Sequence, residues 1–129
     1  MSEKIAEEWL EKAKSDLSVA RILTEHDGPR DAICFHAQQA VEKLFKCYLA
    51  GRGQKPPRTH DLAWLCRLAS NHHSDFKRDL DDCRWLTQFY IESRYPVGGD
   101  TEYTPEVVER CLEIAERIAD RVQEYFGGN

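Results

Sequence analysis

The sequence lacks any long hydrophobic run. No apolar stretch approaches the roughly 20 residues that a membrane-spanning helix needs, and the opening Met1-Ser2-Glu3-Lys4 does not begin a signal peptide. There is no basic surplus either, because the formal net charge is −5 at pH 7. A general nucleic-acid binder carries such a surplus. We therefore expect a cytoplasmic protein that binds neither a membrane nor DNA, while a small local basic site for a nucleotide or an RNA strand remains open.

Motifs of several well-known site classes are also missing. There is no phosphate-binding glycine-rich loop, no G-x-S-x-G and no H-E-x-x-H. The Glu-x-x-His pattern of di-iron bundles is absent, and the adjacent His72 and His73 cannot form an i, i+4 pair on one helical face. The sequence therefore predicts no metal site and no cofactor.

Cysteines with metal-binding or redox spacing are absent too. The chain has five cysteines, an odd number, and no C-x-x-C motif. Each lies within a helical pattern, mostly beside apolar residues, so we expect small buried side chains rather than disulfides or metal ligands. They are Cys34, Cys47, Cys66, Cys83 and Cys111.

What the chain does have is helical periodicity along nearly its whole length. Apolar residues recur at steps of three and four, and no stretch alternates apolar and polar residues as a strand would. Asp27-Gly28-Pro29, Pro56-Pro57 and Thr104-Pro105 are stop and start signals between the periodic segments. The expected helices cover about residues 3–25, 29–50, 61–69, 75–95 and 105–126.

These helices predict the fold class. At 129 residues the chain is one domain, 1–129. Three helices of about 23 residues each span about 35 Å, and the shorter pair can close the fourth side. We expect an all-α, up-and-down bundle of four or five helices with no β-sheet. The first helix should face the core with Ile5, Trp9, Ala13, Leu17 and Ala20.

The second helix carries the most unusual polar groups. His36, Gln39 and Lys43 follow one another at steps of three and four beside an apolar stripe, so their side chains are neighbours. They form either a plain polar edge or part of a binding site. A single helical histidine is more often structural than catalytic. Glu42 and Lys43 are either surface charges or partners of residues on the fourth helix.

His60 begins the third helix after a rigid Pro56-Pro57-Arg58 segment. The free N–H groups and the dipole at a helix start favour an anion, and Arg58 and His60 could add donors to a phosphate. The alternative is that His60 and Asp61 only cap the helix.

Arg94 ends the fourth helix, just before Pro96 and two glycines. Its guanidinium could grip a phosphate, or it could simply be favoured by the helix dipole. Tyr95 and Tyr103 stand nearby in the sequence and offer rings on which a base could stack, or they pack the end of the bundle.

Three segments, in this order and spacing, resemble the HEPN domain family. They are AICFHAQQAVEKLFK at Ala32–Lys46, THDL at Thr59–Leu62 and SRYP at Ser93–Pro96. Members are small helical domains encoded beside minimal nucleotidyltransferases in bacteria and archaea. The resemblance implies a helical bundle, usually a homodimer, that binds a nucleotide or RNA. Many relatives are metal-independent endoribonucleases and toxins, with a signature of Arg, four to six residues, His, any residue and Tyr.

The chain departs from this signature at the position of the histidine. Six residues after Arg94 stands Thr101 in place of histidine, and Tyr103 keeps the tyrosine position. A threonine hydroxyl has no pKa near neutrality and cannot replace imidazole as a general base. Ribonuclease activity therefore does not transfer directly.

Three hypotheses follow. The first is a dimeric module that binds a nucleotide or RNA near Arg94 and the second helix, working with a nucleotidyltransferase in a toxin–antitoxin-type pair; the partner could modify Tyr103. The second is a ribonuclease in which His36 or His60 reaches Arg94 and supplies the base. The third is a protein-interaction bundle without a ligand. For the dimer, the aromatic surplus of Trp64, Trp85, Phe89 and Tyr90 suggests an interface.

Overall fold

Five α-helices and one short 3₁₀ helix make up the protein in a computed structural model that describes residues 2–92 and 102–127. The elements are α1 (Ser2–Glu25), α2 (Arg30–Gly51), α3 (Leu62–Ser70), η1 (Ser74–Asp79), α4 (Leu80–Glu92) and α5 (Pro105–Gly127). No strand occurs in these described ranges, and the expected all-α bundle is confirmed. Over the same residues, no helix has the length and apolar character that crossing a bilayer requires.

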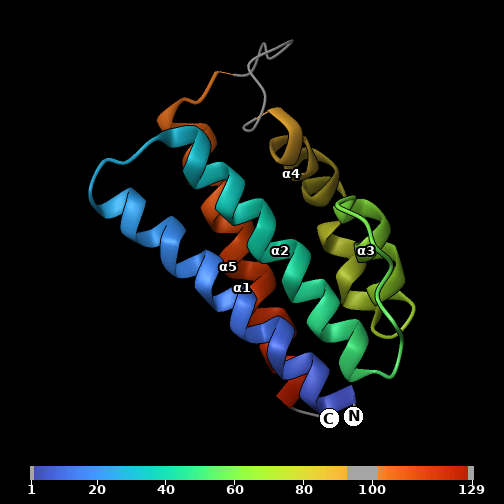
Figure 1. Ribbon diagram of the computed structural model, residues 1–129. Helices are drawn as coiled ribbons and strands as arrows, with labels where there is room; N and C mark the ends of the chain where they lie inside the picture. The colour runs from blue at the N-terminus through green and yellow to red at the C-terminus, as the bar shows by residue number, and fades with distance from the viewer. Residues whose placement is uncertain (1, 93–101, 128–129) are drawn as a thin grey trace.

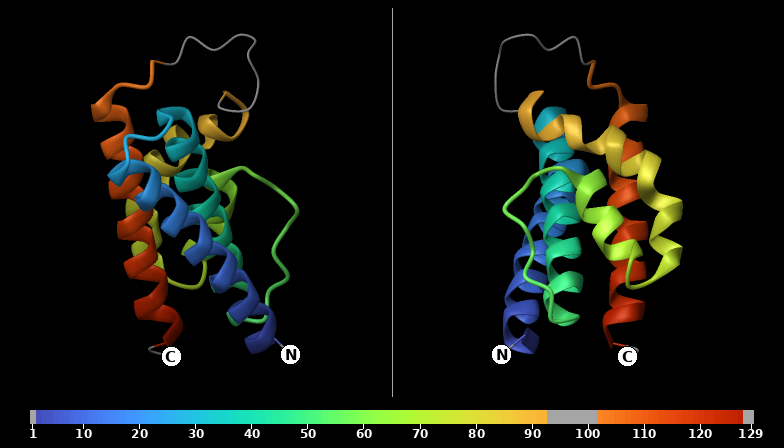
Figure 2. Two further views of the ribbon diagram at one scale, coloured as in Figure 1. Left: turned by 60° about the vertical axis from the view of Figure 1, so that its left-hand side comes forward. Right: turned by 90° about the vertical axis from the view of Figure 1, so that its right-hand side faces the viewer.

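Helix α2 is the centre of the bundle. It packs against α1, α3, α4 and α5, and α1 runs opposite to it while α5 runs alongside in the same direction (Figures 1 and 2). The segment 52–61 returns along α2 as an extended connector, so α3 begins beside the middle of α2 (Figure 2). The short helices α3 and α4 then close the remaining side, as the sequence predicts.

The helix ends follow from local capping. Asp61 accepts hydrogen bonds from the backbone N–H of Ala63 and Trp64 at 3.0 and 3.3 Å, and Thr104 Oγ1 accepts one from Val107 at 3.1 Å. The fourth expected helix is different at its start, where Ser74–Asp79 forms 3₁₀ turns before α4 begins. In a 3₁₀ helix, side chains three residues apart lie on the same side. Phe76 and Asp79 are spaced in this way and both are 0% exposed, so both can contact the rest of the bundle.

Helix α1 approaches α2 through small side chains. Ala6, Ala13 and Ala20 are fully buried along this contact. The expectation that Ile5 faces the core is wrong, because Ile5 is 44% exposed. Ala6 takes the inward position against Cys47 and Ala50 of α2, and Trp9 packs on the edge of this small cluster.

The sequence predicts one buried face for α2, but the helix is buried on nearly all sides. Because it is surrounded by four helices, its polar residues are enclosed as well. Gln38 is 0%, Glu42 4% and Lys46 6% exposed. Each therefore needs a polar partner inside the protein.

A charged seam joins η1 to α5. Asp79 Oδ1 and Oδ2 accept hydrogen bonds from Nε of Arg117 at 3.2 Å and Nε of Arg121 at 2.9 Å. Beside it, the Tyr125 hydroxyl donates to Asp75 Oδ2 at 2.5 Å, and this hydrogen bond lowers the pKa of the Asp75 carboxyl. The seam therefore fastens η1, and with it the start of α4, to the last long helix of the bundle.

All five cysteines are buried and free, as the sequence predicts. Hydrogen bonds with Cys66 and Cys34, together with burial, raise the pKa of Cys83 and Cys111 well above the ordinary range. Burial raises the pKa of Cys47 to about 11. We predict that a disulfide reagent at pH 8 reacts with the native thiols at least about ten-fold more slowly than with the urea-unfolded chain, because thiolate is the reactive form. Fast reaction of the native protein would contradict this burial.

Candidate functional site

A polar cluster lies along α2 where α1 and the connector meet it. We call it the α2 flank; its members are Asp16 of α1, His36, Gln39, Glu42 and Lys43 of α2, and His60 of the connector. Asp16 is 8% exposed and receives two partners. His36 Nδ1 lies 2.8 Å from its Oδ1, and Lys43 Nζ lies 2.6 Å from its Oδ2. The sequence predicts His36 and Lys43 as neighbours, and a single carboxylate from α1 joins them.

Glu42 forms the second half of the α2 flank. Its Oε1 lies 2.7 Å from His60 Nδ1, and its Oε2 accepts a hydrogen bond from Lys46 Nζ at 3.0 Å. Gln39 Nε2 donates to Gln38 Oε1 at 2.8 Å and lies 3.5 Å from Glu42 Oε1. Glu42 is therefore not a surface charge. Among the described residues, the ion-pair partners of Glu42 and Lys43 are on α1, on α2 itself and in the connector, and none is on α4. Because α2 lies at the centre of the bundle, these side chains meet α1 and the connector.

The last described turn of α4 lies beside this cluster. The rings of Tyr90 and His60 stack with centroids 3.7 Å apart and an interplanar angle of 14°. Tyr90 also lies near Phe35 of α2, with ring centroids 6.2 Å apart. The candidates Arg94 and Tyr95, and Thr101 of the signature, lie outside the described residues.

Two further candidates from the sequence are Tyr103 and Arg58. The Tyr103 ring packs 5.9 Å from that of Phe89, its hydroxyl oxygen is buried, and its carbonyl accepts a hydrogen bond from Arg30. Arg58 borders a pocket that Trp9, Lys46 and Ala50 also line. The roles predicted for both residues as ligand-binding groups stay predictions.

The start of α3 is occupied by the chain itself. Asp61 accepts from Ala63 and Trp64, and Thr87 Oγ1 accepts from the N–H of Leu62 at 3.0 Å. These N–H groups are therefore not available to a phosphate. The structure therefore shows a capped helix start, which is the alternative that the sequence left open for this segment.

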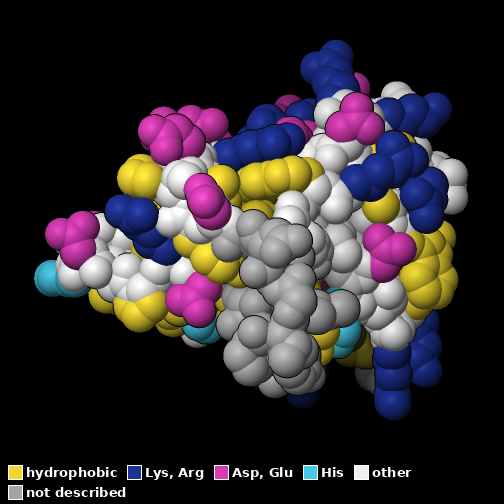
Figure 3. Space-filling model, turned by 90° about the horizontal axis from the view of Figure 1, so that it is seen from above, with side chains coloured by type: hydrophobic (Ala, Val, Ile, Leu, Met, Phe, Trp, Pro, Cys, Tyr) yellow, Lys and Arg dark blue, Asp and Glu magenta, His cyan; other side chains and the backbone are white. Residues whose placement is uncertain are grey.

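The end of the bundle at which α2 and α5 begin carries charges of both signs (Figures 1 and 3). Acidic and basic side chains lie next to one another around its rim (Figure 3). A mixed rim provides local contacts rather than a broad attractive field for nucleic acid.

The two histidines of the α2 flank share one arrangement that suits proton transfer. Each faces a buried carboxylate through Nδ1, so the carboxylate accepts the Nδ1 proton and orients the ring. Within the described ranges, no hydrogen bond is made by either Nε2. His36 and His60 side chains are 29% and 48% exposed. Each Nε2 is thus the ring atom that can meet a phosphate or a hydroxyl. The described residues hold no group of three metal-ligand side chains.

Asp16 is the site residue that sequence reasoning missed. It lies between Ala13 and Leu17 in the buried stripe of α1. An acidic residue within an otherwise apolar stripe needs a polar partner on the facing helix. That signal is present in the sequence and would have identified Asp16.

A comparison with protein families now decides the assignment. The model of the HEPN domain matches residues 6–125, nearly the whole chain. The chain belongs to the HEPN domain family. This agrees with the resemblance carried by Ala32–Lys46 and the two shorter segments.

Similar proteins extend this HEPN assignment. A crystal structure titled as that of ST0689, an archaeal HEPN homologue, has a TM-score of 0.74 and 28% identity, covering 94% of this chain and 97% of that one. The crystal structure of TT1696 from Thermus thermophilus has a TM-score of 0.79 and 29% identity, with 92% and 96% covered. A Methanocaldococcus jannaschii protein named "Putative toxin MJ1304" is 24% identical, covering 95% of this HEPN chain and 89% of its own.

Proposed function

We propose that this HEPN domain is a nucleotide- or RNA-binding module that acts with a minimal nucleotidyltransferase in a toxin–antitoxin-type pair. The observation that carries the proposal is the α2 flank. Two imidazole rings are each oriented by a buried carboxylate, and the ring of His60 stacks on Tyr90 of α4. Such rings offer hydrogen-bond donors to phosphate. The name of the Methanocaldococcus jannaschii relative supports a toxin–antitoxin-type pair, and the nucleotidyltransferase is the partner that the HEPN resemblance implies.

Arg94 is the cation that we propose for the phosphate at this site. Replacing it with alanine should raise the Kd for RNA or a nucleotide about ten-fold or more, because a charge-assisted hydrogen bond contributes about 1.5–3 kcal/mol. Fluorescence anisotropy with a labelled RNA and thermal shift with nucleotides would measure this. Arg84→Ala is the matched control, since Arg84 is an exposed arginine of α4 paired only with Asp81 at 3.1 Å among described residues.

Failure of the unaltered protein to bind any nucleotide or RNA would contradict the module. The third hypothesis, a helical protein-interaction bundle, would then stand. A search of the neighbouring genes for a minimal nucleotidyltransferase, and co-purification with its product, would test the partner separately. An absence of a complex at micromolar concentration would count against a toxin–antitoxin-type pair.

A metal-independent endoribonuclease is the second candidate, and one observation favours it. The Nδ1–carboxylate contact of His36 is the arrangement that orients a general base. If this candidate holds, RNA is cleaved in excess EDTA and His36→Gln lowers the rate about 100-fold. His26→Gln, at the exposed end of α1, is the control. Intact RNA after long incubation would exclude the activity.

The homodimer also remains a proposal. Phe89 is 1% exposed, Trp85 lies under the guanidinium of Arg110 at 4.0 Å, and Tyr90 stacks on His60. Of the four aromatic residues, Trp64 is 43% exposed and is the best candidate for an interface. Light scattering of the purified protein tests the dimer directly.

A further inference from the structure

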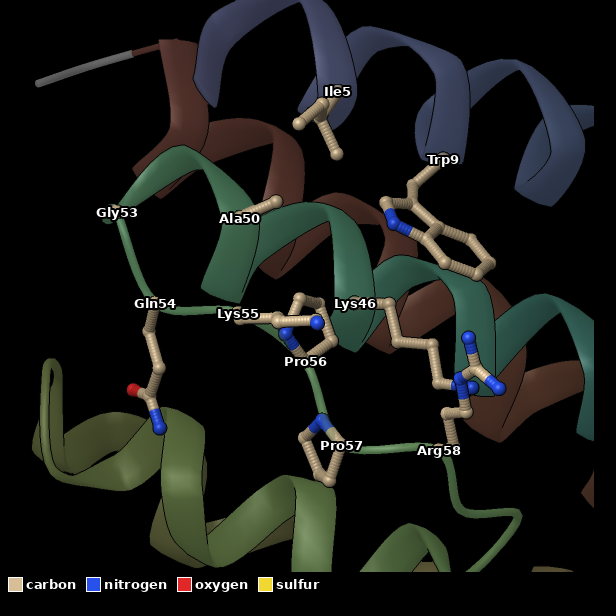
Figure 4. A pocket seen from close by; sticks show the side chains of 10 residues that line it. All are labelled: Ile5, Trp9, Lys46, Ala50, Gly53, Gln54, Lys55, Pro56, Pro57 and Arg58. Atoms are coloured by element: carbon tan, nitrogen blue, oxygen red, sulfur yellow. The ribbon is translucent and has the colours of Figure 1, made fainter. Parts of the chain in front are cut away.

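The pocket that Arg58 borders lies at the surface, between the first turns of α1 and the connector (Figure 4). Its volume is about 570 Å³, and we call it the α1 pocket. Ile5 and Trp9 project from α1 on one side, and Pro56 and Pro57 lie on the connector opposite them (Figure 4). Ile5 is 44% exposed here. Apolar side chains that are exposed together rather than singly are typical of a surface that another molecule covers.

The connector side of the α1 pocket is fixed before a ligand binds. At one end of the connector, the Gln54 N–H donates to the Leu49 carbonyl at 2.9 Å. At the other end, Gln38 Nε2 donates to the His60 carbonyl at 3.2 Å. Between these ends the rings of the two prolines restrict the backbone further. A wall that is already ordered lowers the entropy that binding costs.

The connector also presents backbone groups without partners. Of residues 55–58, Lys55 and Arg58 are the two that have an N–H group, because proline has none. Among the described residues, neither N–H donates a hydrogen bond. A second extended peptide can pair with an extended segment whose backbone groups are free. This favours a polypeptide over a small apolar molecule as the occupant.

Arg58 is the free cation at one end of the α1 pocket. The side chains of Lys46 and Arg58 extend toward this end, and Lys55 lies apart from them (Figure 4). Glu42 neutralises Lys46 at 3.0 Å, whereas Arg58 has no ion-pair partner among residues 2–92 and 102–127. A single guanidinium beside an apolar wall suits one carboxylate, which it can bind through two parallel hydrogen bonds.

The adjoining surface of α1 carries the opposite charge. Glu8 and Glu11 border it together with Lys12, and this surface shares two apolar residues with the α1 pocket. Within the described ranges, neither glutamate forms an ion pair. A nucleic acid strand is negative throughout and is repelled by these carboxylates. A polypeptide carries side chains of both signs, so its charges can match the connector and α1 together.

We propose that the α1 pocket binds an extended segment of a different polypeptide. A large apolar side chain of the segment lies between Ile5, Trp9 and the proline pair, and a neighbouring acidic residue meets Arg58. A second copy of this chain is a poorer fit, because a two-fold dimer places the same surface on both sides and sets one hollow against another. The segment needs neither a nucleotide nor RNA, so its binding stands whether or not the proposed function does.

Selection of phage-displayed random peptides of about 12 residues on the purified chain tests the α1 pocket. We expect the enriched peptides to share a large apolar residue with Asp or Glu close to it in sequence. Fluorescence anisotropy then measures the Kd of one enriched peptide in labelled form. No enrichment over the same selection on Ile5→Ser, or enriched peptides without an acidic residue, would overturn the proposal.

Two isoleucines of α1 form a matched pair for this measurement. Ile5→Ser should raise the Kd about ten-fold or more, because it removes an apolar contact of the bound side chain. Ile22→Ser is the control, since Ile22 is 53% exposed on the same helix and does not line the pocket. Both side chains are exposed, so neither substitution should unfold the chain, which a melting curve checks. Equal affinities of the two variants would refute the pocket. If light scattering shows that Ile5→Ser converts a dimer to a monomer, a second copy is the occupant and the proposal is wrong.

A charge exchange locates the acidic residue of the peptide. Arg58→Glu should raise the Kd about ten-fold or more, and the affinity should return when that peptide residue is changed to lysine. Arg67→Glu, on α3 and outside the pocket, is the control. Arg94→Ala should leave the Kd unchanged, which separates this binding from the proposed function. A peptide whose affinity is insensitive to Arg58→Glu, or is not restored by the exchange, would contradict the assigned contact.

Discussion

Replacing Asp79 with alanine should lower the free energy of unfolding by about 3–5 kcal/mol. The side chain is fully buried and accepts hydrogen bonds from Arg117 Nε at 3.2 Å and Arg121 Nε at 2.9 Å. Its removal leaves the Arg121 guanidinium, on a side chain only 14% exposed, without its carboxylate. It also removes the buried ion pairs between η1 and α5, so the hydrogen bond of Tyr125 to Asp75 is left to hold η1. The effect therefore exceeds that of an exposed ion pair, which is about 0–1 kcal/mol.

Urea unfolding followed by circular dichroism measures this change. The melting temperature should fall by about 10–20 °C in a domain of this size. Asp81→Ala is the matched control, because Asp81 follows two residues later, has a side chain 95% exposed and contacts Arg84 at 3.1 Å. We expect the control to change stability by less than about 0.5 kcal/mol. Similar losses for the two variants would show that Asp79 acts only as a surface charge.

The bundle could be predicted from the sequence because its signals are local. Thr104-Pro105 fixes the start of α5, and Asp61 caps α3, through hydrogen bonds within three residues of each cap. The apolar spacing of the long helices then decides the rest of the secondary structure. Among the described residues, the clear difference is in the first turns of the fourth helix, since their 3₁₀ form accompanies the burial of Phe76 and Asp79 against other elements.

The polar contacts of the site could be predicted only in part. The steps between His36, Gln39 and Lys43 place them on one side of α2, which is a property of the helix alone. Their partners come from elsewhere in the chain: Asp16 binds His36 and Lys43, and Glu42 binds His60. Which helix covers a given side of α2 depends on tertiary packing. A pattern of hydrophobic residues in one helix does not contain that information.

For the same reason, the sequence alone did not predict that α2 is buried on nearly all sides. A helix with one neighbour buries one stripe, whereas α2 has four neighbours and buries even Glu42 and Lys46. In the sequence these two residues look like an ordinary i, i+4 surface pair. The difference matters energetically, because a buried pair loses far more than an exposed one when one partner is removed.

Glu42→Ala is therefore the second substitution with a large expected effect. Lys46 has a side chain 8% exposed and depends on Glu42 Oε2 at 3.0 Å, while His60 Nδ1 depends on Oε1 at 2.7 Å. Without Glu42 the buried ammonium loses its countercharge, and we expect a loss of about 3–5 kcal/mol in the free energy of unfolding. Glu116→Ala is the control: its partner Arg21 is 55% exposed and Glu116 45%, so the loss there should be below about 1 kcal/mol.

A double variant distinguishes the cost of an unpaired charge from a loss of packing. Glu42→Leu combined with Lys46→Met removes both charges and keeps the volume nearly constant, so most of the stability lost in Glu42→Ala should return. His60, with a side chain 48% exposed, can then turn to water for its hydrogen bond. If the double variant is as unstable as Glu42→Ala, the hydrogen bond to His60 rather than the buried charge pair holds the connector to α2. Chemical denaturation of the three proteins at pH 7 separates these two outcomes.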